Sequence, residues 1–234
     1  MKRYFNIFAL IIMGILFLFS GCDKKKEVTG VTIIPDICVL RVGEARELVA
    51  VVSPDDADDK SVKWAIKALF PIDLDKGLEV ATIENGKVKG VSEGIAVVTC
   101  ITNNMFYETD ALVMVGYAVA VRGTYKGSLS KNGTVVDSGF KIGIDHLSEY
   151  EALFGLPFLT EADSVKSCPV TVSKENEKTM YFEGENTISL QGVMTPVQVS
   201  GYVTLDGIGD FEILLGNDVV TAYTFFGPIE TRPF

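Results

Sequence analysis

Residues 80–100 read VATIENGKVKGVSEGIAVVTC, and this stretch decides the fold of the first half of the chain. Apolar and polar residues alternate on both sides of Asn85-Gly86, with Ile83 before the pair and Val88 after it. A period of two predicts half-buried β-strands. Asn-Gly suits the positive φ angles of a tight hairpin. The stretch therefore predicts short antiparallel strands.

The same pattern extends outward over residues 28–116, which we interpret as about seven short strands. The expected inward positions are Val31, Ile33, Leu40, Val42, Leu48, Ala50, Val52, Val62, Trp64, Ala81, Ala96 and Val98. β-Branched and aromatic residues are frequent along the whole chain, and helical periodicity is nearly absent. This composition favours an all-β protein. The length suits two modest domains.

The ordered signals of residues 28–116 resemble the bacterial immunoglobulin-like domain of group 2, which occurs in intimin- and invasin-type adhesins and in surface lipoproteins. The resemblance implies a β-sandwich that acts as a spacer or recognition module without catalytic residues, with Trp64 packed between its sheets. The segments that carry it are Pro35, LRVGE at 40–44, PDDA at 54–57, KSVKW at 60–64, VATI at 80–83, GKVKGV at 86–91 and GIA at 94–96.

Residues 65–79 depart from that family, whose members have only a few residues at this point. The stretch carries apolar Leu69, Phe70 and Ile72. Leaving such residues in water costs about 25 cal/mol per Å² of apolar surface. We therefore expect an enlarged loop that contacts the second domain, a partner or its own sandwich.

The second half, residues 117–234, shows the same alternation, with Val119, Val121 and Tyr125 on one face of a first strand and a hairpin signal at Asn132-Gly133. About eight strands joined by tight turns predict an antiparallel meander, either a β-barrel or a flattened sandwich.

One short helix is expected over residues 148–154. Ser148 and Glu151 have the spacing of a capping box, and Gly155 follows as a helix stop. Together with GTYKG at residues 123–127, this layout resembles lipocalin-like (calycin-like) domains of surface lipoproteins. The resemblance implies either a barrel mouth for a small apolar ligand or a barrel filled by its own side chains.

The N-terminus has the features of an export signal. Lys2 and Arg3 precede an apolar run over residues 7–19, which is shorter than the roughly 20 residues that span a membrane. FSGC at residues 19–22 resembles a lipobox, although Phe19 stands where Leu, Val or Ile is usual. The resemblance implies a signal peptide over residues 1–21 and acyl chains, such as palmitate, on Cys22. Residues 22–27 would be a tether. We expect the chain to be anchored in the cell envelope at the outer membrane, and the sequence does not distinguish its periplasmic face from its surface face.

Charge and cysteine usage exclude several function classes. A net charge of −10 disfavours nucleic acid as a partner. Cys38 and Cys100 have inward parity, so they form either a disulfide or two buried thiols. His146 is the only histidine, and we expect it at the surface or at a helix cap. The sequence predicts neither a metal site, nor a cofactor, nor an enzyme.

The leading hypothesis is a lipid-anchored binding or adhesion module, in which the immunoglobulin-like spacer presents the C-terminal β domain to carbohydrate or protein. Tyr181 and Tyr202 have outward parity and are the expected ligand face. The alternatives are a lipocalin-type carrier of a small apolar ligand and a purely structural envelope component.

Overall fold

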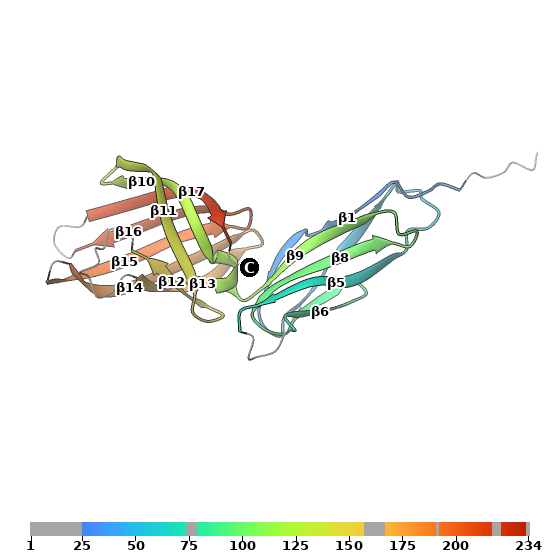
Figure 1. Cartoon of the computed structure of the whole chain (residues 1–234), viewed down its shortest axis with the longest axis horizontal. Coiled ribbons are helices and arrows are strands. Elements are labelled where there is room, and N and C mark those ends of the chain that lie inside the picture. Colours follow the sequence, from blue (N-terminus) through green and yellow to red (C-terminus); the bar gives the residue numbers. More distant parts are fainter. Residues whose placement is uncertain (1–24, 74–78, 157–166, 191, 217–220, 233–234) are drawn as a thin grey trace, which may run out of the picture.

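The computed structural model describes residues 25–73, 79–156, 167–190, 192–216 and 221–232. These residues form two bodies side by side, a sandwich built from β1–β9 and a closed barrel built from β10–β17 (Figure 1). One short helix, α2 (Tyr117–Val121), lies between the two. The prediction of an all-β chain with an N-terminal immunoglobulin-like part is confirmed.

The sandwich contains a four-stranded sheet, a three-stranded sheet and a separate strand pair. In the order of their pairing, these are β2 (Ile37–Leu40), β9 (Glu108–Val115), β8 (Gly94–Thr102) and β5 (Val62–Pro71); β3 (Ala45–Glu47), β7 (Lys87–Gly90) and β6 (Ala81–Glu84); and β1 (Gly30–Ile34) with β4 (Val49–Ser53). Asn85 and Gly86 turn the β6–β7 hairpin with φ of 49° and 83°, as the Asn-Gly pair predicts.

The inward parity of Cys38 and Cys100 is confirmed, since both are fully buried, but they are free thiols and not a disulfide. Both belong to the same sheet, with β9 between their strands. In the strand register, Cys38 of β2 is paired with Val113 of β9, and Val113 is paired with Ala96 of β8. Cys100 lies four residues beyond Ala96 on β8. The two are thus about 10 Å apart across the sheet and about 13 Å along it. A disulfide needs Cα atoms within about 7 Å.

Of the loop expected over residues 65–79, residues 65–71 belong to strand β5 (Val62–Pro71), and residues 74–78 lie outside the described residues. Leu69 and Phe70 belong to β5 and pair with Ala96 and Ile95 of β8, because a bulge between Ile66 and Ala68 absorbs one extra residue. Leu69 packs against the sandwich core. Ile72 lies just beyond the strand and packs against the other apolar cluster, which continues into the barrel.

The barrel closes by pairing β17 with β10, and each strand between them pairs with its sequence neighbours. The meander prediction is confirmed, and of its two forms the barrel is the one adopted. The strands are β10 (Gly123–Lys131), β11 (Thr134–His146), β12 (Glu151–Gly155), β13 (Ser167–Asn176), β14 (Thr179–Leu190), β15 (Val193–Thr204), β16 (Ile208–Leu215) and β17 (Thr221–Thr231).

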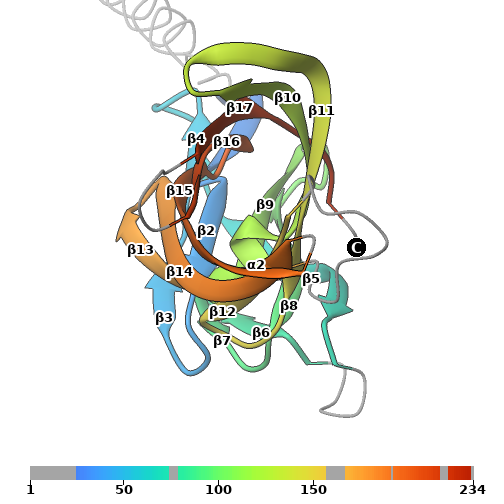
Figure 2. The ribbon, with the colours of Figure 1, turned by 90° about the vertical axis from the view of Figure 1, so that its left-hand side faces the viewer.

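Helix α2 occupies residues that were expected to begin the first barrel strand. Ala118 to Val121 are all buried, whereas a surface strand would leave alternate residues exposed. A view along the barrel shows α2 across its opening (Figure 2). The helix therefore closes the end of the barrel that faces the sandwich, where apolar surroundings on every side favour burying each residue.

Candidate functional site

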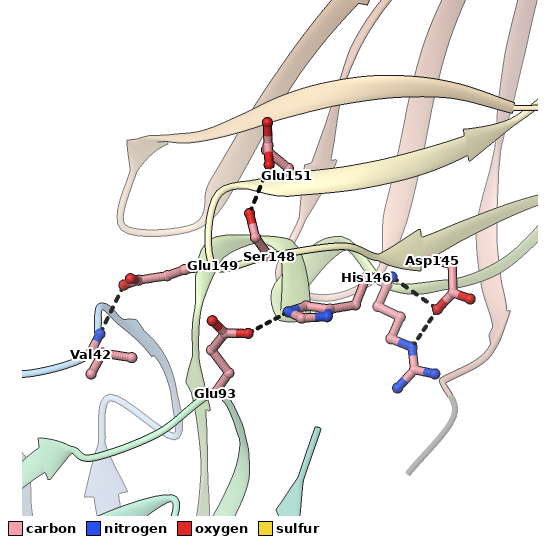
Figure 3. A network of polar contacts seen from close by, with 8 residues as sticks. Val42, Glu93, Asp145, His146, Ser148, Glu149 and Glu151 are labelled. Carbon is pink, nitrogen blue, oxygen red and sulfur yellow. Dashed lines mark hydrogen bonds and ion pairs between the residues drawn. The ribbon is translucent and has the colours of Figure 1, made fainter. Parts of the chain in front are cut away.

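The joint between the two bodies is held by polar contacts around the β11–β12 turn (Figure 3). Nε2 of His146, at the end of β11, lies 2.7 Å from a carboxylate oxygen of Glu93 on the sandwich, and the two side chains are 10% and 19% exposed. The expectation of a surface or capping role for His146 is therefore wrong. The residue is half-buried because the sandwich lies against it.

Further contacts cross the same joint. The backbone N–H of Val42 donates to Oε1 of Glu149 over 2.9 Å, and Arg46 of β3 forms an ion pair with Glu177 of the β13–β14 turn. One apolar cluster is continuous across the boundary, because Val39, Ile95 and Met114 of the sandwich share it with α2 and the barrel core. A joint with both kinds of contact resists bending.

The helix predicted over residues 148–154 does not form, and the helix found among the described residues is α2. Ser148 Oγ does hydrogen-bond Glu151 Oε2, over 3.1 Å, as a capping pair would. Here the bond closes the tight turn between β11 and β12, with Ser148 N donating to Glu151 O over 2.9 Å. Pairing of β12 with β11 and β13 continues the closed sheet, and this tertiary pairing overrides the local helix signal.

Aromatic side chains fill the centre of the barrel. Phe211 packs against four other rings at centroid separations of 5.2–5.3 Å. Each of the five rings is less than 2% exposed; they are Tyr125, Phe154, Phe182, Phe211 and Phe225. Of the two outcomes that the lipocalin resemblance implies, the filled interior is the one seen.

The outer wall of the barrel brings Tyr181 and Tyr202 together, a pairing that parity alone does not predict. They are directly opposite each other on β14 and β15, and Asp210 and Phe226 continue the row on β16 and β17. Tyr202 is 38% exposed and Phe226 58%. Tyr202 Oη donates to Asp210 over 3.1 Å, and this hydrogen bond raises the pKa of the phenol.

Next to this row, the wall is hollowed over β14 and β15. One hollow of about 510 Å³ is bordered by Tyr181, Glu183 and Ser200. A second, of about 690 Å³, reaches Pro196 and shares Glu185, Gln198 and Leu214 with the first. The combined surface offers an aromatic ring, carboxylates, an amide and a hydroxyl. We call it the outer-wall groove.

Acidic side chains of the turn at residues 55–59 form ion pairs and hydrogen bonds with other residues of the same chain. Lys26 forms an ion pair with Asp56, and its backbone N–H donates to Asp58 over 2.8 Å. Hydrogen bonds from Ser61 and Asn103 lower the pKa of Asp59 to about 2. Within the described ranges, no three His, Cys, Asp or Glu side chains gather as a metal site would require, and no helix is long and apolar enough to cross a membrane.

Cys22 and residues 1–21 lie outside the described residues. The comparison with curated proteins finds no match to the chain. The model of the bacterial Ig-like domain (group 2) matches residues 27–112, which end within the last sandwich strand. The matched segment coincides with the part of the chain that folds as a sandwich with its own buried core. Residues 27–112 of this chain are a bacterial Ig-like domain of group 2.

Proposed function

We propose that this protein is a non-catalytic binding module of the bacterial cell envelope, which binds carbohydrate or protein through the outer-wall groove of its barrel. The Ig-like domain serves as the spacer between a lipid anchor at Cys22 and the barrel. Ig-like domains of group 2 are typical of surface and adhesion-type proteins, which supports this class of function.

The observation that carries the proposal is that the hollows of the outer-wall groove lie outside the barrel. Its centre is taken up by its own aromatic rings, which disfavours the carrier alternative, whereas its outer wall has hollows of about 510 and 690 Å³. Aromatic residues at such surfaces supply large contact areas at small entropic cost. Carboxylate, amide and hydroxyl groups beside them accept or donate hydrogen bonds to a polar ligand.

The position of the groove also suits presentation from an anchored N-terminus. The first described residues lie at the end of the sandwich away from the barrel (Figure 1). A ligand on the barrel would therefore be held at the far side of a rigid spacer. Residues 22–27 would link that spacer to the membrane.

The test is binding of the full chain to arrays of glycans and of proteins, alongside a Tyr181→Ala, Tyr202→Ala double variant. We expect the double variant to bind the same array members about thirtyfold more weakly or not at all, because loss of anchoring aromatic residues removes about 2 kcal/mol or more. The matched control is Phe106→Ala, which removes an 82% exposed aromatic ring from the sandwich. Equal binding by the double variant and the control would contradict the proposal.

Anchoring is tested separately by cell fractionation. Cys22→Ala is expected to move the chain from the membrane fraction to the soluble fraction, because two or more acyl chains hold a protein stably on a membrane. Retention of Cys22→Ala in the membrane fraction would contradict the lipid anchor without bearing on the groove.

A further inference from the structure

Arg232 differs from the other arginines that the structure describes. Arg41 lies 3.5 Å from Glu44, Arg46 pairs with Glu177, and Arg122 lies 3.0 Å from Asp145. No carboxylate of the described residues pairs with Arg232, although this side chain is partly buried. In a chain with 31 acidic and 21 basic residues, an arginine without an acidic partner is unexpected.

The surroundings of Arg232 leave most of its hydrogen-bonding capacity unused. It follows β17 at the joint, and its Nη1 lies 2.9 Å from Met114 Sδ on the sandwich. A thioether is a weak acceptor, whereas a guanidinium carries five N–H donors. Burial lowers the pKa of Arg232 by removing water from its charge, and no carboxylate of the described residues compensates this loss. An anion at this place would supply the missing charge.

Space for such an anion adjoins the residue. Arg232 and Arg122 border a hollow of about 620 Å³ on the wall formed by β10, β11 and β12. Gly143 leaves open space there, since a Cβ added to it would meet nothing within 4 Å. Hydroxyls of Thr124, Thr231 and Ser167 also border it.

The described residues that border this hollow include one positive charge that no carboxylate neutralises. Arg122 and Asp145 neutralise each other across 3.0 Å, so Arg232 supplies the one uncompensated charge among the described residues that border the hollow. A guanidinium binds carboxylate, phosphate and sulfate groups through two parallel hydrogen bonds. Neighbouring hydroxyls can donate further bonds to the same oxygens.

We propose that Arg232 binds the oxyanion group of a small ligand, a carboxylate, phosphate or sulfate, in the hollow bordered by Arg122, Thr124, Gly143 and Thr231. This site is distinct from the outer-wall groove on β14 and β15, and its existence does not depend on the proposed function.

The test is an NMR titration of the full chain in detergent with sodium acetate, phosphate and sulfate, at ionic strength held constant with sodium chloride. We expect saturable shifts at the amides of Gly123, Thr124, Gly143 and Thr231 with at least one of the three salts. Arg232→Gln should weaken the binding about tenfold or more, because a charge-assisted hydrogen-bonded contact is lost. Comparison of the three salts identifies the preferred oxyanion.

Two further variants distinguish binding from a structural role. Arg41→Gln removes the same charge from an exposed arginine and should leave the titration unchanged. Arg232→Lys keeps the charge without the two-pronged donor and should bind at intermediate strength, so it replaces Arg232→Gln if that variant does not fold. The proposal is overturned if no salt gives saturable shifts at these amides, or if both Arg232 variants bind as the original chain does.

Discussion

At the residue scale, Tyr125 joins the helix to the barrel core. Its hydroxyl donates to the carbonyl of Val121 over 2.6 Å, and its ring packs edge-on against Phe211 with centroids 5.2 Å apart. Tyr125→Phe keeps the ring and leaves the carbonyl without this donor. We expect the free energy of unfolding to fall by about 1–2 kcal/mol, measured by urea denaturation at pH 7. An unchanged free energy would show that the bond contributes nothing.

The same residue predicts a dependence on alkaline pH. Burial raises the pKa of Tyr125 above its usual value of 10.0. Its contribution to stability is therefore fully present below about pH 10 and is lost as pH rises further, because the unfolded chain releases the proton first. Tyr125→Phe should lose less stability than the original chain between pH 9 and 11. Parallel losses in both chains would contradict the assignment.

The three buried cysteines should be unreactive in the folded protein. Burial raises the pKa of Cys38, Cys100 and Cys168 to about 11, so almost no thiolate is present at pH 8. We expect no iodoacetamide adduct on these residues in the native chain, and adducts on all three in urea. Mass spectrometry of peptides measures both. Rapid native labelling, or a peptide joining Cys38 to Cys100, would contradict the structure.

At the element scale, the barrel depends on Phe211 of β16, the ring that packs against the most others. Replacing it by alanine opens a cavity at the centre, and we expect a loss of about 3–5 kcal/mol in the free energy of unfolding. Phe226→Ala on β17 is the matched control, because that ring is 58% exposed and surface changes usually stay within about 0.5 kcal/mol. Similar losses in both variants, from thermal or urea unfolding, would contradict a filled barrel.

Strands were predictable from the sequence because alternation is a local signal. Residues 80–100 carry both their strands and their turn, and the structure has both. The two errors on helices share one cause. In both places, tertiary packing overrides the local pattern. Ser148 and Glu151 form the hydrogen bond of a capping pair, but pairing of the neighbouring strands places it in a turn. Residues 117–121 have the alternation of a strand, but they form a helix in which residues 118–121 are all buried.

The candidate site was predictable only in part. Outward parity identifies Tyr181 and Tyr202 one at a time, but the register that places them opposite each other is set by the pairing of β14 with β15 in the folded chain. His146 and Glu93 come from different bodies, and no periodicity relates them. That no carboxylate of the described residues pairs with Arg232 is visible only in the folded chain.

At the scale of the whole molecule, the joint should make the two bodies move as one. Replacing His146 and Glu149 by alanine removes two contacts between them. In residual dipolar couplings, we expect one common alignment for both bodies in the original chain and different alignments in the double variant. Glu108→Ala, which removes a 60% exposed carboxylate from the sandwich, is the control. Separate alignments in the original chain would show a free hinge.

In the proposed function, ligands bind to the outside of a filled barrel. The most direct measurement is an NMR titration of the full chain with the array member that it binds most strongly, following amide and aromatic signals together. We predict that the shifted signals belong to the outer wall, at Tyr181, Glu183, Ser200 and Tyr202, while the ring signals of Phe182, Phe211 and Phe225 stay in place. Shifts of those interior rings, with an unchanged outer wall, would instead show that the ligand enters the barrel.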